Sequence, residues 1–139
     1  MTTAVRHLFV YGLLKSGSTN GHGEPERARL NREATLLGPA SIRGQLYDLG
    51  SFPGLVDSDD GRDLVHGEVY LLRTPAETFL WLDDYEDYFE HDLARCLYAR
   101  ETRPVLLSTR EALKAWVYVY VSSREAATRI ASGRWTCSV

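Results

Sequence analysis

The sequence contains few cysteines, no long apolar run and no cluster of basic residues. Its two cysteines, Cys96 and Cys137, cannot build the disulfide framework of a small secreted protein. No apolar run approaches the ~20 residues that a membrane-spanning helix needs, and the first residues, MTTAVRH, lack the long apolar region of a secretory signal. We therefore expect a cytoplasmic protein that does not associate with a membrane.

Patterns typical of metal and nucleic-acid binding are also missing. The four histidines and two cysteines occur singly, without the HxxxH, HxH or CxxC spacing of a zinc site, so we expect no metal. A lone cysteine such as Cys96 is more often a small buried residue than a nucleophile. The net charge of -3 at pH 7 and the lack of a basic run argue against a nucleic-acid partner.

The composition is that of a globular protein with a substantial core. With 139 residues, of which 44% are hydrophobic and 25% charged, the chain is expected to form one domain over residues 1–139. Apolar segments predict strands at 8–10, 34–38, 40–49, 64–72, 97–107 and 114–121. The Asp-Gly pair in SDDGRD predicts a hairpin in which residues 64–72 return against the segment that begins at Leu55.

Helices are marked by capping patterns. Thr74 and Glu77 have the spacing of a capping box, with Pro75 at the first helical position, and predict a helix that ends near residue 88. Ser122 and Glu125 repeat the spacing and predict a short final helix that ends near residue 133.

The stretch from Phe9 to Gly17, FVYGLLKSG, predicts a strand that runs into a turn able to hold a ligand. Gly12 has no Cβ, so a ligand can approach the main chain there and accept hydrogen bonds from its N–H groups. An ordinary turn is the alternative, and a phosphate-binding loop is disfavoured because Ser18 stands where that motif requires lysine. Residues 15–32 are polar and predict a long surface loop, a candidate lid, with a short helical piece at its end.

Glu86 is the strongest candidate for catalysis. Placing residues 100° apart puts it on the same helix stripe as Phe79 and Leu82. A carboxylate on an apolar stripe must be hydrogen-bonded, paired or protonated, because burying it alone costs several kcal/mol. Glu86 is therefore either a general base in a cleft or a helix-end carboxylate that reaches water or pairs with an arginine such as Arg95 or Arg100.

Other polar and aromatic residues lie near these elements in the sequence. Asp83 and Asp84 fall at the edge of the stripe and opposite to it, so we expect both to be solvated. Trp116, Tyr118 and Tyr120 alternate along the last predicted strand and share one face. They predict either ordinary sheet packing or an aromatic wall that offers phenols for hydrogen bonding.

Several stretches together resemble the gamma-glutamylcyclotransferase-like family. They are, in chain order, FVYGLLKSG from Phe9, LGPASIRGQLYDLGSFPGLV from Leu37, VHGEVYLL from Val65, LDDYE from Leu82, YAR from Tyr98, AWVYVY from Ala115 and ASGRW from Ala131. The resemblance implies an α+β fold. It is a small mixed, strongly bent β barrel or sheet with a few flanking helices and a cavity at its mouth.

The resemblance also implies an activity. It implies that the chain cyclises a γ-glutamyl amide to 5-oxoproline and releases the amine, without a metal or cofactor. The implied partner is thus a small γ-glutamyl substrate, and the leaving amine, the pathway and the oligomeric state stay open. A non-catalytic protein that binds an amino-acid carboxylate in the same cavity is the alternative, and retention of Glu86 favours the enzyme.

The family's site residues carry over to matching positions here. They are Glu86 as the general base, the turn of Tyr11, Gly12, Leu13 and Leu14 as the substrate holder, Tyr118 as a phenol, and Arg100 as the charge that orders the site. Leu13 departs from the pattern, because the family usually has Thr or Ser there. The main-chain donors survive this change, but a side-chain hydroxyl contact does not, which leaves the substrate preference open.

Overall fold

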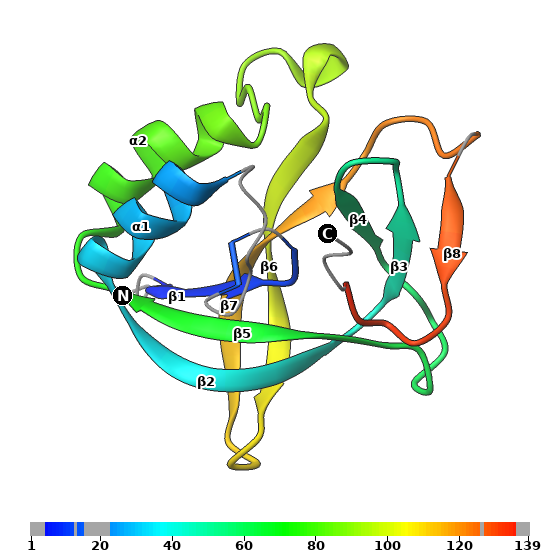
Figure 1. The fold of residues 1–139 in the computed structure, drawn as a ribbon, viewed down its shortest axis with the longest axis horizontal. Helices are drawn as coiled ribbons and strands as arrows, with labels where there is room; N and C mark the ends of the chain where they lie inside the picture. Colours follow the sequence, from blue (N-terminus) through cyan, green and yellow to red (C-terminus); the bar gives the residue numbers. More distant parts are fainter. Residues whose placement is uncertain (1–4, 13, 16–22, 126, 136–139) are drawn as a thin grey trace.

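The computed structural model describes residues 5–12, 14–15, 23–125 and 127–135; Leu13 and Cys137 therefore lie outside the described residues. The elements follow in this order (Figure 1): β1 (His7–Val10), α1 (Glu24–Glu33), β2 (Ala34–Arg43), β3 (Gln45–Asp48), β4 (Pro53–Val56), β5 (Leu64–Leu72), α2 (Pro75–Tyr85), the 3-10 turn η1 (Leu93–Arg95), β6 (Tyr98–Leu107), β7 (Ala112–Tyr120) and β8 (Thr128–Ile130).

The sheet closes into a barrel with an extension. Strands β1, β5, β2, β6 and β7 are neighbours in that order and pair antiparallel, and the barrel closes where β1 runs parallel to β7, with Leu8 opposite Trp116. Strand β4 pairs parallel with β7 and leads to β3 and β8. The long strands β2 and β5 curve together along one side (Figure 1). The predicted α+β fold, with its small mixed barrel and few helices, is confirmed.

Two groups of buried side chains hold these layers together. The first lies inside the barrel and draws on all its strands, with Phe9, Ile42, Val69, Val105 and Val117 among its members. The second lies between the sheet and the helices and includes Leu8, Val10, Leu30, Tyr70, Phe79 and Leu82. Successive side chains of β1 thus alternate between the two groups, and this explains its continuous apolar sequence.

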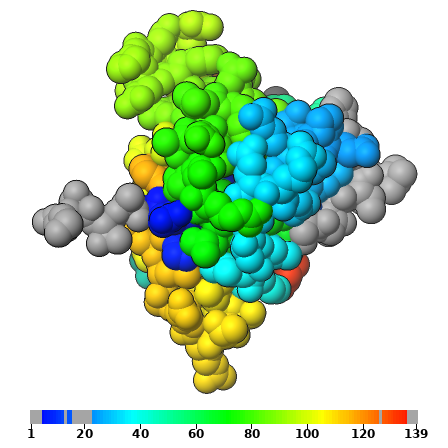
Figure 2. Space-filling model, turned by 90° about the vertical axis from the view of Figure 1, so that its left-hand side faces the viewer, coloured from blue at the N-terminus to red at the C-terminus, as the bar shows by residue number. Residues whose placement is uncertain are grey.

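Helices α1 and α2 lie side by side over one face of the sheet, as Figures 1 and 2 show. Glu33 at the end of α1 joins them, because its carboxylate accepts hydrogen bonds from the Thr78 hydroxyl at 2.7 Å and the Trp81 indole N–H at 3.1 Å. Thr74 is the N-cap residue of α2, as predicted, but its side chain forms no capping hydrogen bond. None of the described helices has the length and apolar character needed to cross a membrane.

Some predicted elements are wrong. Residues 24–33 form a helix of 10 residues, α1, where the sequence predicted mostly loop. The predicted final helix is replaced by β8, which pairs antiparallel with β3 and brings Ile130 against the barrel core. The predicted hairpin into β5 is also absent from the described sheet, because the two edges of β5 pair with β1 and β2, whereas β4 pairs with β3 and β7.

Gly67 on β5 lies directly against the end of β1. A Cβ atom at this position would clash with the Val10 carbonyl oxygen and the Phe9 ring. We predict that Gly67→Ala lowers the free energy of unfolding by about 1–3 kcal/mol or more, because main-chain atoms cannot move away cheaply. Gly61→Ala is the matched control, since its Cβ would meet only the Arg43 side chain at 3.7 Å. Equal urea midpoints for the two variants would contradict this account.

Candidate active site

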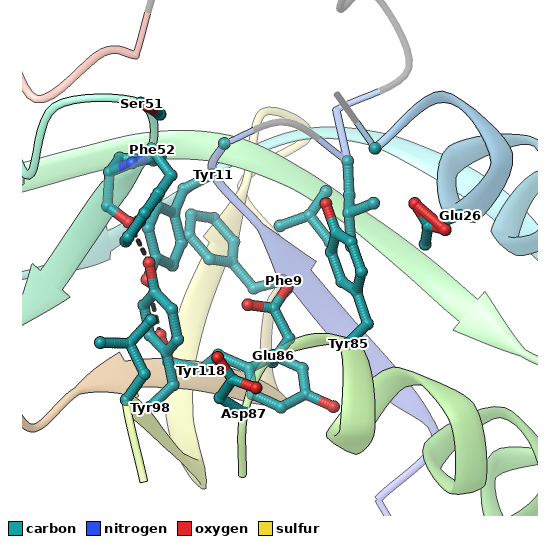
Figure 3. Close-up of a pocket in the computed structure, with 16 residues that line it drawn as sticks. Phe9, Tyr11, Glu26, Ser51, Phe52, Tyr85, Glu86, Asp87, Tyr98 and Tyr118 are labelled. Atoms are coloured by element: carbon teal, nitrogen blue, oxygen red, sulfur yellow. Dashed lines mark hydrogen bonds between the residues drawn. The ribbon is translucent and has the colours of Figure 1, made fainter. Parts of the chain in front are cut away.

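A cavity of about 360 Å³ lies between the end of β1, the turn before β4 and the C-terminal end of α2 (Figure 3). Its lining consists of Phe9, Val10, Tyr11, Gly12, Leu14, Gly23, Glu26, Ser51, Phe52, Pro53, Tyr85, Glu86, Asp87, Leu97, Tyr98 and Tyr118. These residues come from segments far apart in the chain, so the cavity exists only in the folded protein. The two elements singled out from the sequence, the turn after β1 and Glu86, face the same space.

The way α2 ends directs Glu86 into the cavity. Glu86 is the C-cap residue, and Asp87 follows in the left-handed region with a φ of 53°. The Asp87 N–H donates to the Asp84 carbonyl at 3.2 Å, and the Tyr88 N–H donates to the Asp83 carbonyl at 2.9 Å. These bonds form a Schellman motif, in which glycine is usual at the position of Asp87. The helix therefore stops at Tyr85, earlier than predicted, and the chain turns so that the Glu86 carboxylate points inward (Figure 3).

The Glu86 carboxylate has no hydrogen-bond or ion-pair partner among the described residues. None of the described residues donates a hydrogen bond to it or forms an ion pair with it. Burial of the carboxylate end raises the pKa of Glu86 from its ordinary value of 4.5 to about 8, and the negative charges of Asp87 and Asp83 add to the increase. Near neutral pH the side chain is thus close to its titration midpoint, which suits a group that accepts and returns a proton.

The predicted alternative for Glu86, pairing with an arginine, is wrong. Arg95 pairs with Asp92 at 3.6 Å, within the exposed segment around η1. Arg100 forms a bidentate pair with Asp83, at 2.8 Å and 3.1 Å. The part of the chain that the structure describes places no basic side chain in the cavity lining.

Asp83 is an anchoring residue rather than a solvated one, which corrects the expectation from the sequence. Besides the two bonds from Arg100, its carboxylate accepts a hydrogen bond of 2.7 Å from the Tyr118 hydroxyl. The Arg100 guanidinium lies 3.9 Å from the ring centroid of Phe79 and 4.4 Å from that of Trp116. Arg100 therefore contacts the end of α2 and lies outside the described cavity lining.

Tyrosine hydroxyls hold the cavity walls together. The Tyr11 hydroxyl donates to the Tyr118 carbonyl at 2.6 Å and accepts from the Leu55 N–H at 3.2 Å, so it links β1, β7 and β4. The Tyr98 hydroxyl donates to the Pro53 carbonyl. Burial raises the pKa of Tyr11, with a contribution from the charge of Glu86, so this phenol stays neutral. Tyr11 and Tyr118 thus offer their rings to the cavity, while their hydroxyls are engaged elsewhere.

The turn after β1 is closed by a main-chain hydrogen bond and packs closely against Pro53. The Lys15 N–H donates to the Gly12 carbonyl at 3.1 Å and closes the turn. A Cβ at Gly12 would lie 2.7 Å from the Pro53 Cγ, so glycine is needed for packing against the turn before β4 as well as for access to the main chain. Gly12 and Leu14 line the cavity, as predicted; the substrate-binding role assigned to Leu13 concerns a residue outside the described part.

Several lining residues were missed from the sequence. Phe52 belongs to a segment that the sequence analysis treated only as a turn, and Glu26 to one that it treated as a loop. Tyr85 and Asp87 adjoin Glu86 and could have been included from their position alone. The pKa of Tyr85 is raised to about 12 by burial and by the charges of Glu86 and Glu26.

No group of histidine, cysteine and acidic side chains suited to hold a metal occurs among the described residues. Cys96 is buried, and its sulfur accepts a hydrogen bond from the Phe89 N–H at 3.1 Å, which fits the structural interpretation.

Known proteins resemble this chain along most of its length. Residues 8–137 match the model of a family described as gamma-glutamyl cyclotransferase, AIG2-like. A Vibrio cholerae protein is 36% identical over 134 residues, which cover 94% of this chain and 96% of that protein. The gamma-glutamylcyclotransferase family protein ytfP of Citrobacter rodentium is 34% identical over 129 residues, 92% and 93% of the two chains. The solution structure of Escherichia coli ytfP has a TM-score of 0.62 and 29% identity, over 93% of this chain and 95% of that one.

The raised pKa of Glu86 has a consequence for stability. Between pH 4.5 and about 8 the folded protein binds a proton that the unfolded chain has released, so the stability contributed by this site falls as pH rises. We predict that Glu86→Gln gains stability over the natural protein, and that this gain is larger at pH 9 than at pH 5 by on the order of 2–4 kcal/mol. Urea unfolding at several pH values measures it. Glu90→Gln, at an exposed position, is the control and should show no such trend.

Proposed function

Because the chain belongs to the gamma-glutamyl cyclotransferase, AIG2-like, family, we propose that it cyclises a γ-glutamyl amide to 5-oxoproline and releases the amine, with Glu86 as its general base. The observation that carries this proposal is the Glu86 carboxylate, which faces the cavity with no partner among the described residues (Figure 3). A carboxylate kept in this state is costly to the fold, so a role in chemistry accounts for it better than a role in packing.

The first step removes a proton from the substrate. The α-amine attacks the γ-carbonyl carbon of the same molecule and closes a five-membered ring, but an ammonium group has no lone pair with which to attack. Ionised Glu86 takes the proton. Its pKa of about 8 is close to the 7.7–8.0 of an ordinary α-amino group, so the transfer is nearly balanced in free energy.

The second step returns the proton. The ring nitrogen of the tetrahedral intermediate still carries the two remaining protons of the original ammonium group. Protonated Glu86 donates its proton to the leaving nitrogen as the bond from the former γ-carbonyl carbon to that nitrogen breaks. Glu86 then takes one proton from the ring nitrogen and passes it to the amine, which leaves as an ammonium ion. The carboxylate is then ionised again. No water enters and no net proton is gained or lost, so neither a metal-bound water nor a cofactor is needed for the step.

Charge in the cavity suits the substrate's ammonium group. The ionisable lining residues of the described part are acids and phenols, with Glu26 and Asp87 beside Glu86. A protein built only to bind a carboxylate would be expected to place a positive charge there, so the cavity favours the enzyme over that alternative. We assign the substrate's own carboxylate and the developing oxyanion to main-chain N–H groups of the turn at Gly12, Leu13 and Leu14.

Tyr118 and Arg100 take indirect parts in this proposal. The Tyr118 ring forms cavity wall, while its hydroxyl and the Arg100 guanidinium both bind Asp83. They order the site and do not contact the reacting atoms.

We predict that Glu86→Gln lowers kcat to less than about a tenth of the natural value while ligand affinity changes by no more than a few fold, because an amide keeps the shape but cannot accept the proton. Release of 5-oxoproline from a panel of γ-glutamyl amides measures turnover, and calorimetry with 5-oxoproline measures binding. Glu90→Gln should retain full activity. A Glu86→Gln variant with more than a tenth of the rate would refute the assignment of the base.

We predict that N-acetylation of the substrate's α-amine abolishes turnover, because that amine is the nucleophile. A hydrolase acting on the same amide would use water and release glutamate, which differs from 5-oxoproline in mass. Competition with the unblocked substrate establishes whether the acetylated compound still binds. Early release of glutamate without the cyclic product would mean that Glu86 activates water.

A further inference from the structure

We propose that Asp83 is a positioning residue for Glu86: it fixes the end of α2 against β6 and β7 and holds Arg100 in an ion pair, so that the Glu86 carboxylate faces the cavity without a cationic partner. The role in catalysis rests on the proposed function, whereas the role in setting the state of Glu86 does not. Asp83 itself lies outside the described cavity lining, so it acts through Glu86 and not on the substrate.

The first argument is geometric. Asp83 accepts hydrogen bonds with its side chain from Arg100 on β6 and Tyr118 on β7, and with its main chain from the Tyr88 N–H in the motif that ends the helix. One residue thus connects the last turn of α2, the sheet beneath it and the loop beyond it. Glu86 lies inside this short segment, so its direction depends on bonds that Asp83 makes.

The second argument concerns charge. The Arg100 side chain is only 17% exposed and lies over the Phe79 and Trp116 rings, at a partly buried position where a cation without an anion is unfavourable. Asp83, 22% exposed, supplies the anion and lies outside the described cavity lining. The negative charges of Asp83 and Glu86 both raise the pKa of Tyr118, so both carboxylates lie near its hydroxyl. Without Asp83, the guanidinium would lose its anion beside the one carboxyl that the reaction needs unpaired.

The other described ionisable groups in the cavity lining bring no positive charge to Glu86. The described ionisable groups that line its cavity are Tyr11 from β1, Glu26 from α1, Tyr85 and Asp87 at the end of α2, Tyr98 from β6 and Tyr118 from β7. All of them are neutral or negative near pH 7. Outside the lining, Arg27 on α1 acts on the neighbouring Tyr85, and Arg100, which also acts on Tyr118, is the basic side chain that Asp83 binds directly.

Comparison of Asp83→Asn with Asp84→Asn tests this inference. The substitutions remove the same charge from adjacent positions of α2, but Asp84 is exposed and makes no side-chain contact with Arg100 or Tyr118. The side-chain carboxyl of Glu86 is followed by 13C NMR titration, with Glu86→Gln identifying its signal, and kcat and KM are measured on the most active γ-glutamyl amide.

We expect Asp83→Asn to move the Glu86 titration to lower pH by about one unit or more, and to lower kcat at least tenfold with KM within about threefold. Asp84→Asn should leave the titration and kcat close to those of the natural protein. Tyr118→Phe keeps the ion pair between Asp83 and Arg100 but loses the hydrogen bond to Asp83. It should lower kcat while the titration midpoint of Glu86 stays nearly unchanged. This variant replaces Asp83→Asn if that protein folds poorly.

An unchanged Glu86 titration in Asp83→Asn, or an equal shift in Asp84→Asn, would overturn the inference. If Asp83→Asn does not fold, the Tyr118→Phe variant decides: a Glu86 titration midpoint about one pH unit lower in this variant would also overturn the inference. Failure of the proposed function looks different: the natural protein would release no 5-oxoproline, while the titration of Glu86 would still respond to Asp83. If turnover requires Glu86 but Asp83→Asn matches the natural kcat and titration, only the positioning role fails.

Discussion

The site depends on one carboxyl group, that of Glu86, which is enclosed by aromatic and aliphatic side chains and has no partner in the described part of the chain. Water and positive charges normally stabilise an ionised carboxylate. Glu86 is largely shielded from water, and none of the described residues that line its cavity supplies a positive charge. The fold must offset this cost elsewhere, and the fully buried side chains of the barrel and of the helix interface supply the stabilisation. Binding of a cationic substrate would remove much of the penalty, because the ammonium group supplies the missing charge.

Hydrogen bonds from phenols keep this arrangement from relaxing. If the walls could move, a neighbouring donor or water would reach Glu86 and its pKa would return towards that of an ordinary carboxyl. Tyr11 and Tyr98 tie β1 and β6 to the main chain around Pro53 and Leu55, so the wall opposite Glu86 is fixed by covalently distant partners. Asp rather than Gly at position 87 also raises the pKa of Glu86: the motif tolerates Asp there at some strain, and its carboxylate places a negative charge next to Glu86.

Much of the fold and part of the site could be predicted from local patterns. The apolar runs identified β1, β5, β6 and β7, the proline and threonine before α2 identified its start, and the 100° spacing placed Glu86 on an inward face. The predictions that were wrong concern residues whose structure depends on partners distant in the sequence. Strand β8 forms because the edge of β3 is available to pair with it, although Ser122 and Glu125, just before β8, have the spacing of a helix start. Asp83 looked solvated because its partners, Arg100 and Tyr118, lie 17 and 35 residues further along the chain.

Closure of the barrel between β1 and β7 has a consequence for how the chain acquires its site. The Tyr11 hydroxyl binds the carbonyl of Tyr118, 107 residues later, so the turn after β1 has no wall to face until β7 has been made. Contacts of such wide sequence separation form late and slow folding, since a long loop must close before they contribute. During synthesis, one edge of β1 therefore stays unpaired until β7 has been translated. The cavity, the hydrogen bonds of the tyrosine hydroxyls and the closed barrel are therefore expected to form in one cooperative step, with no partly assembled cavity before it.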